Sequence, residues 1–177
     1  MIEKNNFIHL YIGDGKGKTT AAAGMAIRAA GWKMSVLFCQ FLKSSETGEL
    51  PVLESLDELI TIYRPSMRHK NFLWTQSPDD LIETREDILK GWETVKEIIS
   101  NKPFNMVIMD EVLDVLKCGF IDERDFIETV RKEPSDVVLT GREASSALMN
   151  IADYITRMTA VRHPFQTGIS SRKGIEY

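Results

Sequence analysis

The run Gly-Asp-Gly-Lys-Gly-Lys-Thr-Thr at residues 13–20 restricts the fold of this chain more than any other feature. It follows a short apolar run and precedes an alanine-rich stretch with helical spacing, so it joins a strand to a helix. Glycines let a loop turn its backbone N–H groups toward one anion, and the following helix adds the partial positive charge of its N-terminus. This order predicts a phosphate-binding loop in an α/β domain.

One position of this loop departs from the usual pattern. That pattern begins with a glycine five places before the Gly-Lys pair, and Ile12 stands there. Three glycines and Lys16 nevertheless keep the loop flexible and cationic. We expect Lys18 to contact phosphate oxygens and the Thr19 hydroxyl to bind Mg²⁺. The alternative is a glycine-rich turn with solvated lysines.

Six short apolar runs alternate with helical patterns. Several runs are continuously apolar, which is typical of parallel strands buried on both faces. The alternation predicts one three-layer α/β domain over residues 1–177, with a mostly parallel sheet of about six strands. The expected strands are 7–12, 35–40, 59–63, 106–110, 137–140 and 154–159. The expected helices are 19–30 (with Gly31 just past the end), 77–101, 111–117, 121–132 and 143–152, and residues 42–54 and 64–77 are expected to be irregular.

Composition excludes several classes of protein. Of 177 residues, 22 are Lys or Arg and 26 are Asp or Glu, so the net charge is −4, whereas a protein that coats a nucleic-acid backbone is usually basic. No apolar run approaches the length of about 18 residues that a membrane span needs. With a polar N-terminus, this predicts a cytoplasmic protein that binds neither nucleic acid nor membrane. Cys39 and Cys118 lack metal-ligand spacing, and Cys39 is expected in the core.

A second candidate element is the apolar run that ends in Asp110-Glu111. An acidic residue at the end of a strand is typical of the metal-side carboxylate of phosphate-loop enzymes. Asp110 or Glu111 would then hold Mg²⁺ directly or through water. The alternative is that Asp110 only caps the helix expected at 111–117.

Two arginines are further candidates for the nucleotide site. Arg28 lies on the first predicted helix, and a solvated side chain is an equal alternative there. Arg142 follows another strand, and ligands of open parallel sheets lie beyond the carboxyl ends of the strands. The residues expected at the nucleotide are Gly13, Asp14, Gly15, Lys16, Gly17, Lys18, Thr19, Thr20, Arg28 and Arg142.

The sequence resembles the ATP-dependent bacterial corrinoid adenosyltransferases of the CobA/BtuR type along nearly its whole length. The resemblance begins with GDGKGKTTAA, and the further matching segments follow in the same order. They are Gln40-Phe41-Leu42-Lys43, Phe72-Leu73-Trp74-Thr75-Gln76, the strand with Asp110-Glu111, Thr140-Gly141-Arg142, Ala152-Asp153, and the tail from Arg162-His163-Pro164-Phe165 to Gly174-Ile175-Glu176-Tyr177. The arm before the first strand is short, at about six residues, and Arg162 replaces a lysine of the family.

This resemblance implies a phosphate-loop NTPase-like (RecA-like) fold and a transfer reaction. Members of the family move the 5′-deoxyadenosyl group of ATP to Co(I) of a corrinoid and release triphosphate, with the nucleotide reversed relative to ordinary phosphate-loop enzymes. Phe72 and Trp74 match an aromatic wedge that removes the lower ligand of Co(II), while Lys18 and Glu111 match catalytic positions. The family further implies Mg²⁺, cobalamin or another corrinoid as substrate, a flavin-dependent reductase or flavodoxin as electron donor, and a homodimer.

Other interpretations stay open at this point. From the residues alone, Phe72 and Trp74 fit a small cluster packed under their loop. The phosphate loop with Asp110-Glu111 also fits a generic phosphate-loop ATPase or a small-molecule kinase. A nucleotide or corrinoid carrier without turnover is a third hypothesis.

Overall fold

The structure, a computed structural model, describes residues 6–43, 47–69, 71 and 73–176. Within these residues, six parallel strands form one sheet in the order β3-β2-β4-β5-β1-β6. The predicted α/β class with a parallel sheet is therefore confirmed. The strands are β1 (Ile8–Ile12), β2 (Val36–Gln40), β3 (Ile60–Tyr63), β4 (Met106–Asp110), β5 (Asp136–Thr140) and β6 (Tyr154–Arg157).

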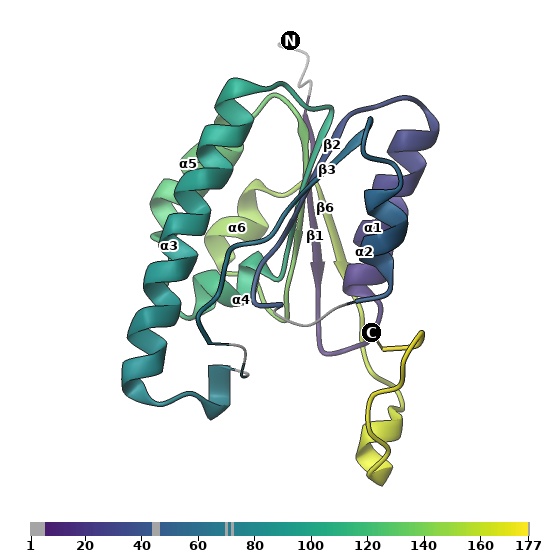
Figure 1. Cartoon of the computed structure of the whole chain (residues 1–177), viewed down its shortest axis with the longest axis vertical. Coiled ribbons are helices and arrows are strands. Elements are labelled where there is room, and N and C mark those ends of the chain that lie inside the picture. Colours follow the sequence, from purple (N-terminus) through teal and green to yellow (C-terminus); the bar gives the residue numbers. More distant parts are fainter. Residues whose placement is uncertain (1–5, 44–46, 70, 72, 177) are drawn as a thin grey trace.

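Helices cover both faces of this sheet, so that two helical layers enclose it (Figure 1). The helices α1 and α2 lie against one face, and α3 to α6 lie against the other. No helix in the described ranges is long and apolar enough to span a membrane. The helices are α1 (Lys18–Gly31), α2 (Glu49–Glu54), α3 (Pro78–Asn101), α4 (Val112–Lys117), α5 (Glu123–Lys132) and α6 (Ser146–Ile151), with short 3₁₀ turns η1 (Leu73–Thr75) and η2 (Pro164–Thr167).

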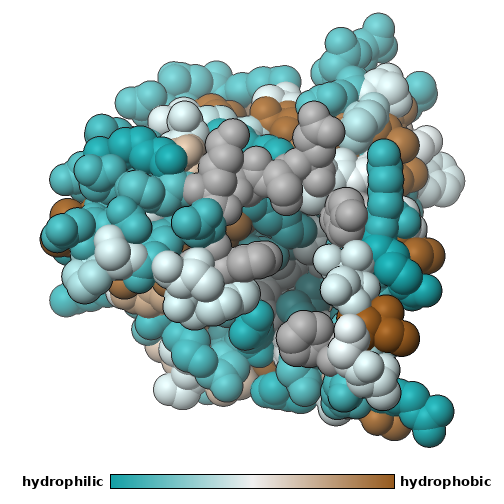
Figure 2. All heavy atoms as spheres, turned by 60° about the horizontal axis from the view of Figure 1, so that its bottom comes forward, coloured by the Kyte–Doolittle hydropathy of each residue, from teal (hydrophilic) through white to brown (hydrophobic). Residues whose placement is uncertain are grey.

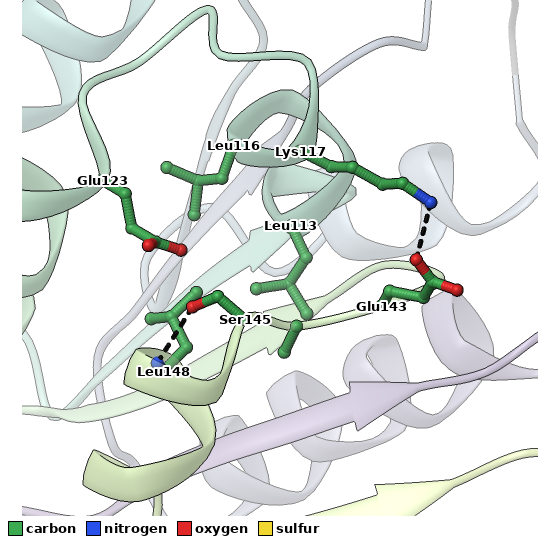
Figure 3. Close-up of a pocket in the computed structure, with 8 residues that line it drawn as sticks. Leu113, Leu116, Lys117, Glu123, Glu143, Ser145 and Leu148 are labelled. Carbon is green, nitrogen blue, oxygen red and sulfur yellow. Dashed lines mark hydrogen bonds and ion pairs between the residues drawn. The ribbon is translucent and has the colours of Figure 1, made fainter.

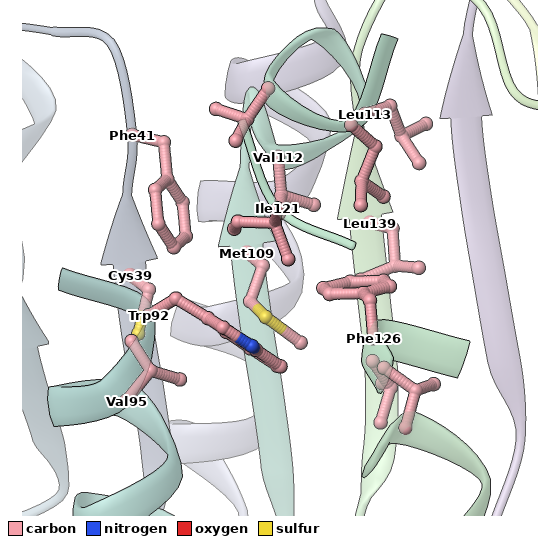
Figure 4. Close-up of a cluster of buried hydrophobic side chains, with 14 of the residues drawn as sticks. Cys39, Phe41, Trp92, Val95, Met109, Val112, Leu113, Ile121, Phe126 and Leu139 are labelled. Carbon is pink, nitrogen blue, oxygen red and sulfur yellow. The ribbon is translucent and has the colours of Figure 1, made fainter. Parts of the chain in front are cut away.

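Alternation along the central strands divides the core into two clusters. In β4, Ile108 packs on the side of α1, whereas Met109 packs on the side of α3 and α5. On that second side Trp92 and Phe126 lie with ring centroids 5.1 Å apart, next to Met109 and Cys39 (Figure 4). Both faces of the central strands are thus buried, which explains their continuously apolar sequences. The expected burial of Cys39 is confirmed.

Local sequence explains where the longest helix begins. The Ser77 hydroxyl accepts a hydrogen bond from the Asp80 backbone N–H at 3.2 Å, and the Asp80 carboxylate accepts one from the Ser77 N–H at 3.2 Å. Pro78 occupies the first helical position, where its missing N–H costs nothing. This reciprocal capping box confirms the predicted start of α3.

Other helix boundaries differ from prediction. Residues 42–54 were expected to be irregular, but α2 forms within them because Leu50 and Leu53 are buried against the sheet. Gly31 does not lie past the end of α1 but is its last residue, and Lys33 takes the left-handed conformation with φ 62°. The helices α5 and α6 begin later than expected because Asp122 and Ser145 are their N-caps.

The last strand is shorter than predicted. It ends at Arg157, not at residue 159, and all four of its residues are exposed. It is one of the two edge strands of the sheet, paired only with β1 among the described strands.

The carboxyl ends of the parallel strands meet at one edge of the sheet, called here the carboxyl edge. Because β5 lies between β4 and β1, the end of β5 at Thr140 stands between Asp110 and the loop after Ile12. Figure 2 looks onto this edge and shows a hollow with hydrophilic side chains visible inside it and beside it. Ligands of open parallel sheets bind at such an edge.

Candidate functional site

The phosphate loop, residues 13–17, runs from β1 into α1 in a conformation that requires glycine. Gly13 and Gly17 have φ angles of 115° and 110°, in the left-handed region. A Cβ added to Gly13 would lie 2.2 Å from the carbonyl oxygen of Met158. Hydrogen bonds of 2.8 Å from the Gly13 N–H to the Arg142 carbonyl and from the Gly15 N–H to the Met158 carbonyl hold the loop. The segments after β5 and β6 therefore shape it.

Lys18 opens α1 and bends back onto this loop. Its ammonium group donates hydrogen bonds to the carbonyl oxygens of Gly13 at 2.7 Å and Gly15 at 2.9 Å. Burial lowers the pKa of Lys18, while the carboxylate of Asp114 acts in the opposite direction. A partly buried cation beside the N-terminus of α1 provides the charge that phosphate oxygens need.

Asp110 joins the phosphate loop to the sheet. It ends β4 with 0% exposure. Its carboxylate accepts hydrogen bonds from the hydroxyl of Thr140 at 2.7 Å, from the hydroxyl of Thr19 at 3.0 Å and from the amide of Gln40 at 3.2 Å. The interpretation that Asp110 only caps a helix is wrong, because the N-cap of α4 is Glu111 and the Asp110 side chain bonds to Thr19.

Lys43 reaches the same place from the end of β2. Its ammonium nitrogen lies 2.9 Å from the Thr19 hydroxyl, 3.2 Å from an Asp110 carboxylate oxygen and 3.8 Å from a Glu111 carboxylate oxygen. Sequence reasoning quoted Lys43 and Gln40 only as part of a matching segment and gave them no role. Their position directly after a predicted parallel strand was the signal that pointed to this edge.

Glu111 has a strained backbone and a perturbed carboxyl group. Its φ is 61°, and its N–H donates to the Thr140 hydroxyl at 2.9 Å. Burial, with the nearby carboxylates of Asp110 and Asp114, raises the pKa of Glu111 to about 7, although Lys43 and Arg142 oppose this. Left-handed conformations of bulky residues gather at functional sites, where the surrounding structure must enforce them.

The donor atoms around Asp110 suit a hard divalent cation. The Thr19 hydroxyl and the Asp110 carboxylate are oxygen ligands of the type that Mg²⁺ prefers, and they lie 3.0 Å apart. The Lys43 ammonium, a cation, already lies against both. No group of three or more His, Cys, Asp or Glu residues able to hold a metal occurs in the described ranges. A Mg²⁺ ion bound here would therefore need oxygen ligands from a substrate phosphate as well as from the protein, as is usual for Mg²⁺.

Trp74 lies in η1, close to Arg142. The guanidinium carbon of Arg142 is 5.6 Å from the centroid of the Trp74 ring, within cation–π range. Trp74 is 69% exposed, and it is Leu73 that packs against the core. The interpretation that Trp74 packs under its loop is therefore wrong. Phe72 lies outside the described residues.

Ion pairs and hydrogen bonds attach the segment before α3, called here the aromatic segment (residues 64–76), to that helix. The backbone N–H and the Nε–H of Arg68 donate to the two carboxylate oxygens of Asp87 at 2.8 and 3.0 Å. Burial alone would raise the pKa of Asp87, but the hydrogen bonds and charge of Arg68 lower it overall. Thr84 donates to the Gln76 amide oxygen at 2.7 Å. Buried groups of α3 thus position the aromatic segment.

The tail after β6 returns to the phosphate loop. The Lys16 ammonium lies 3.7 Å from the Glu176 carboxylate, and the Ala160 N–H donates to Asp14 at 3.4 Å. A hollow of about 550 Å³ opens between Lys16 and the tail, lined also by Arg162 and Arg172. Its volume falls in the range of about 300–1,000 Å³ that is typical of ligand sites.

A second hollow, of about 190 Å³, lies between α4, α5 and α6 (Figure 3). Leu113, Leu116 and Leu148 form its apolar wall, and the ion pair of Lys117 with Glu143 at 2.6 Å lies at its rim. It is smaller than the usual ligand site of about 300 Å³ or more. The hollow beside Lys16, which a residue of the phosphate loop lines, is therefore the better candidate for a nucleotide.

The remaining predicted residues divide into two groups. Asp14 and Thr20 belong to the loop and the first turn of α1, where both are exposed. Arg28 is not brought to the loop, since it lies exposed in the last turn of α1. It lies ten positions after Lys18, which corresponds to about 15 Å along the helix axis.

Known proteins with similar sequences identify the family of this chain. Residues 4–177 match the family described as ATP:corrinoid adenosyltransferase BtuR/CobO/CobP. The chain is 32% identical to a corrinoid adenosyltransferase of Sinorhizobium sp, over 99% of this chain and 82% of that protein. It is 28% identical to corrinoid adenosyltransferases of Pseudomonas aeruginosa and Escherichia coli K12, over 99% of this chain and 85% and 87% of those proteins. Because the family match spans nearly the whole chain and includes the phosphate loop, this protein belongs to the ATP:corrinoid adenosyltransferase family.

Proposed function

We propose that this enzyme transfers the 5′-deoxyadenosyl group of ATP to Co(I) of cobalamin or of an earlier cobinamide-type or cobyrinic acid diamide-type corrinoid, releasing triphosphate. The reaction would serve the synthesis or salvage of adenosylated corrinoids. One observation carries the assignment of the site. The Thr19 hydroxyl bonds to the buried Asp110 carboxylate at 3.0 Å, which joins a phosphate loop and an acidic strand end into one polar centre at the carboxyl edge.

The chemistry asks for positioning and charge, not for a base. Co(I) supplies the electron pair of the new cobalt–carbon bond, and the bond between the 5′ carbon and the triphosphate oxygen breaks. That oxygen leaves with its electron pair, and the cobalt is formally oxidised to Co(III). Because Co(I) carries no proton, no side chain has to remove one. Lys18 and the loop N–H groups stabilise the negative charge of the departing triphosphate.

Thr19 and Asp110, with Glu111 directly or through water, are the residues that would hold Mg²⁺. Bound there, the ion would neutralise negative charge on the triphosphate. Thr140 and Gln40 keep the Asp110 carboxylate in place by donating to its two oxygens at 2.7 and 3.2 Å. This arrangement preorganises the carboxylate before the nucleotide arrives.

Trp74 and Arg142 face the region where the corrinoid would lie. An exposed indole presents a large apolar face to a planar ring, and Arg142 is placed to meet polar groups at its edge. With Phe72, Trp74 would exclude the lower ligand from Co(II) and ease its reduction to Co(I). The electron donor would be a flavin-dependent reductase or flavodoxin, and the enzyme would work as a homodimer in the cytoplasm.

The deciding experiment is an anaerobic assay with ATP, Mg²⁺ and chemically reduced cob(I)alamin, followed by visible spectroscopy and ³¹P NMR. We expect a light-sensitive carbon–cobalt product in equal amount with triphosphate. Parallel reactions with cobinamide, and with EDTA in place of Mg²⁺, identify the preferred corrinoid and the metal requirement. ADP as the phosphate product without any spectral change would instead support the generic phosphate-loop ATPase.

A further inference from the structure

The position of Lys43 is not explained by the roles given so far. Its side chain is 19% exposed, and its ammonium group lies against the Thr19 hydroxyl and the Asp110 carboxylate at 2.9 and 3.2 Å. These are the oxygens that would hold Mg²⁺. Two cations cannot share the same place, so Lys43 and a bound metal ion compete for these ligands.

The backbone holds Lys43 at this point. Leu42, the preceding residue, has a φ of 55°, a conformation that costs about 1–3 kcal/mol for a residue with a side chain. The guanidinium group of Arg64 donates to the Lys43 carbonyl oxygen. A strained turn and a tether on its carbonyl thus keep the start of the Lys43 side chain at the carboxyl edge, whatever its ammonium group contacts.

Besides Glu111, whose carboxylate lies 3.8 Å from the Lys43 nitrogen and would itself take part in holding Mg²⁺, a displaced ammonium group has two places to go. Glu49 in α2 has a carboxylate oxygen 4.0 Å from the Lys43 nitrogen, and it also accepts a bond from Gln40 at 3.4 Å. The second place is the triphosphate itself, which carries several negative charges. Because the long lysine side chain starts from a fixed backbone, a small rotation of its end moves the charge from Asp110 to a phosphate bound beside Thr19.

We propose that Lys43 is a triphosphate-binding residue that exchanges partners with Mg²⁺. Its ammonium group neutralises Asp110 until the metal takes the Asp110 and Thr19 oxygens, and it then bonds to the triphosphate and stabilises it as leaving group. This inference rests on the proposed function of the same site. It predicts opposite effects of removing the charge: weaker binding of triphosphate and stronger binding of a lone divalent cation.

The test measures binding to the whole protein, without turnover. Calorimetry measures the affinity for inorganic triphosphate in excess Mg²⁺, and electron paramagnetic resonance measures the affinity for Mn²⁺ in the absence of triphosphate. We compare the wild type with Lys43→Met, and Lys43→Gln takes its place if the methionine variant does not fold. Lys117→Met is the matched control, because Lys117 pairs with Glu143 at the rim of the other hollow.

We expect Lys43→Met to weaken triphosphate binding by about tenfold or more, the loss expected for one hydrogen bond to a charged group. The same variant should bind Mn²⁺ more tightly than the wild type, whereas Lys117→Met should match the wild type in both. Triphosphate affinity within about twofold of the wild type, or weaker Mn²⁺ binding, would overturn the role of Lys43 alone. If the wild type itself bound no triphosphate, the proposed function would fail with it.

Discussion

The proposed nucleotide side and the proposed corrinoid side of the carboxyl edge differ in how their side chains are held. On the nucleotide side, Asp110 is fully buried and receives hydrogen bonds from two strands and a helix. On the corrinoid side, Trp74 is 69% exposed on a short 3₁₀ turn. A leaving group that gains charge needs dipoles fixed in advance, whereas a large planar substrate needs an open apolar face. The two sides therefore suit the two substrates of one reaction.

The largest effect should come from the nucleotide side. Lys18→Ala removes the ammonium group beside the loop carbonyls and should lower kcat/KM for ATP by about 100-fold or more, as loss of a charge-stabilising group does. Steady-state kinetics with preformed cob(I)alamin measure this. The control is Lys117→Ala, which loses a surface ion pair and should behave as the wild type. Near-normal kinetics of Lys18→Ala would disprove its phosphate role.

Trp74→Ala tests the corrinoid side. Because the side chain is exposed, the free energy of unfolding should change by no more than about 0.5 kcal/mol. The rate of the reaction that starts from Co(II) and a reductant should fall by about tenfold or more, while the rate with preformed Co(I) falls less. Equal losses in the two assays would count against the wedge role and leave Trp74 as a binding surface only.

Thr140→Val tests how far the nucleotide side is preorganised. The hydroxyl of Thr140 donates to Asp110 and accepts from the Glu111 N–H, so valine leaves two buried groups without this partner. We expect a loss of about 1–3 kcal/mol in the free energy of unfolding, measured in urea. Thr140→Ser keeps the hydroxyl and should recover most of this loss. A valine variant as stable as the wild type would show that these bonds are replaceable.

The smallest effect should come from Asp87→Asn, which weakens the attachment of the aromatic segment. We expect a loss of about 1 kcal/mol at neutral pH. Since the pKa of Asp87 is lowered in the folded state, its contribution is present above about pH 4 and disappears as the pH falls through the folded value. Urea unfolding at several pH values should therefore show the two proteins converging in acid. If the difference in the free energy of unfolding between the two proteins stayed constant down to pH 2, the stabilising role of the Asp87 carboxylate would be contradicted.

Much of the fold could be predicted because it depends on local patterns. The strand and the helix around residues 13–20, the capping box at Ser77 and the buried apolar strands all follow from spacing within a few residues. The helix α2 could not be predicted in this way. It is six residues long, too short to be stable alone, and it exists because Leu50 and Leu53 are buried against the sheet.

The residues of the site could likewise be predicted only where a local motif marks them. Lys18, Thr19 and Asp110 could be chosen because each belongs to a recognisable motif, and the structure brings Thr19 and Asp110 together. Arg28 was chosen from its place on a helix next to the loop, yet the helix carries it away from the loop. The sequence marks Lys43 only by its position after a predicted strand, because its contact with Asp110 depends on the pairing of β2 with β4.

The amino-acid sequence by itself determined the phosphate loop, the parallel α/β class and the acidic strand end, because glycine freedom, apolar periodicity and helix capping act over a few residues. Only the tertiary structure decided which groups share the Asp110 carboxylate, that Trp74 is exposed and that Lys43 lies against Asp110 and Thr19. These depend on the order of strands in the sheet, which joins residues more than 60 positions apart. Long-range pairing of this kind comes from packing of the whole chain and leaves no mark in a short segment.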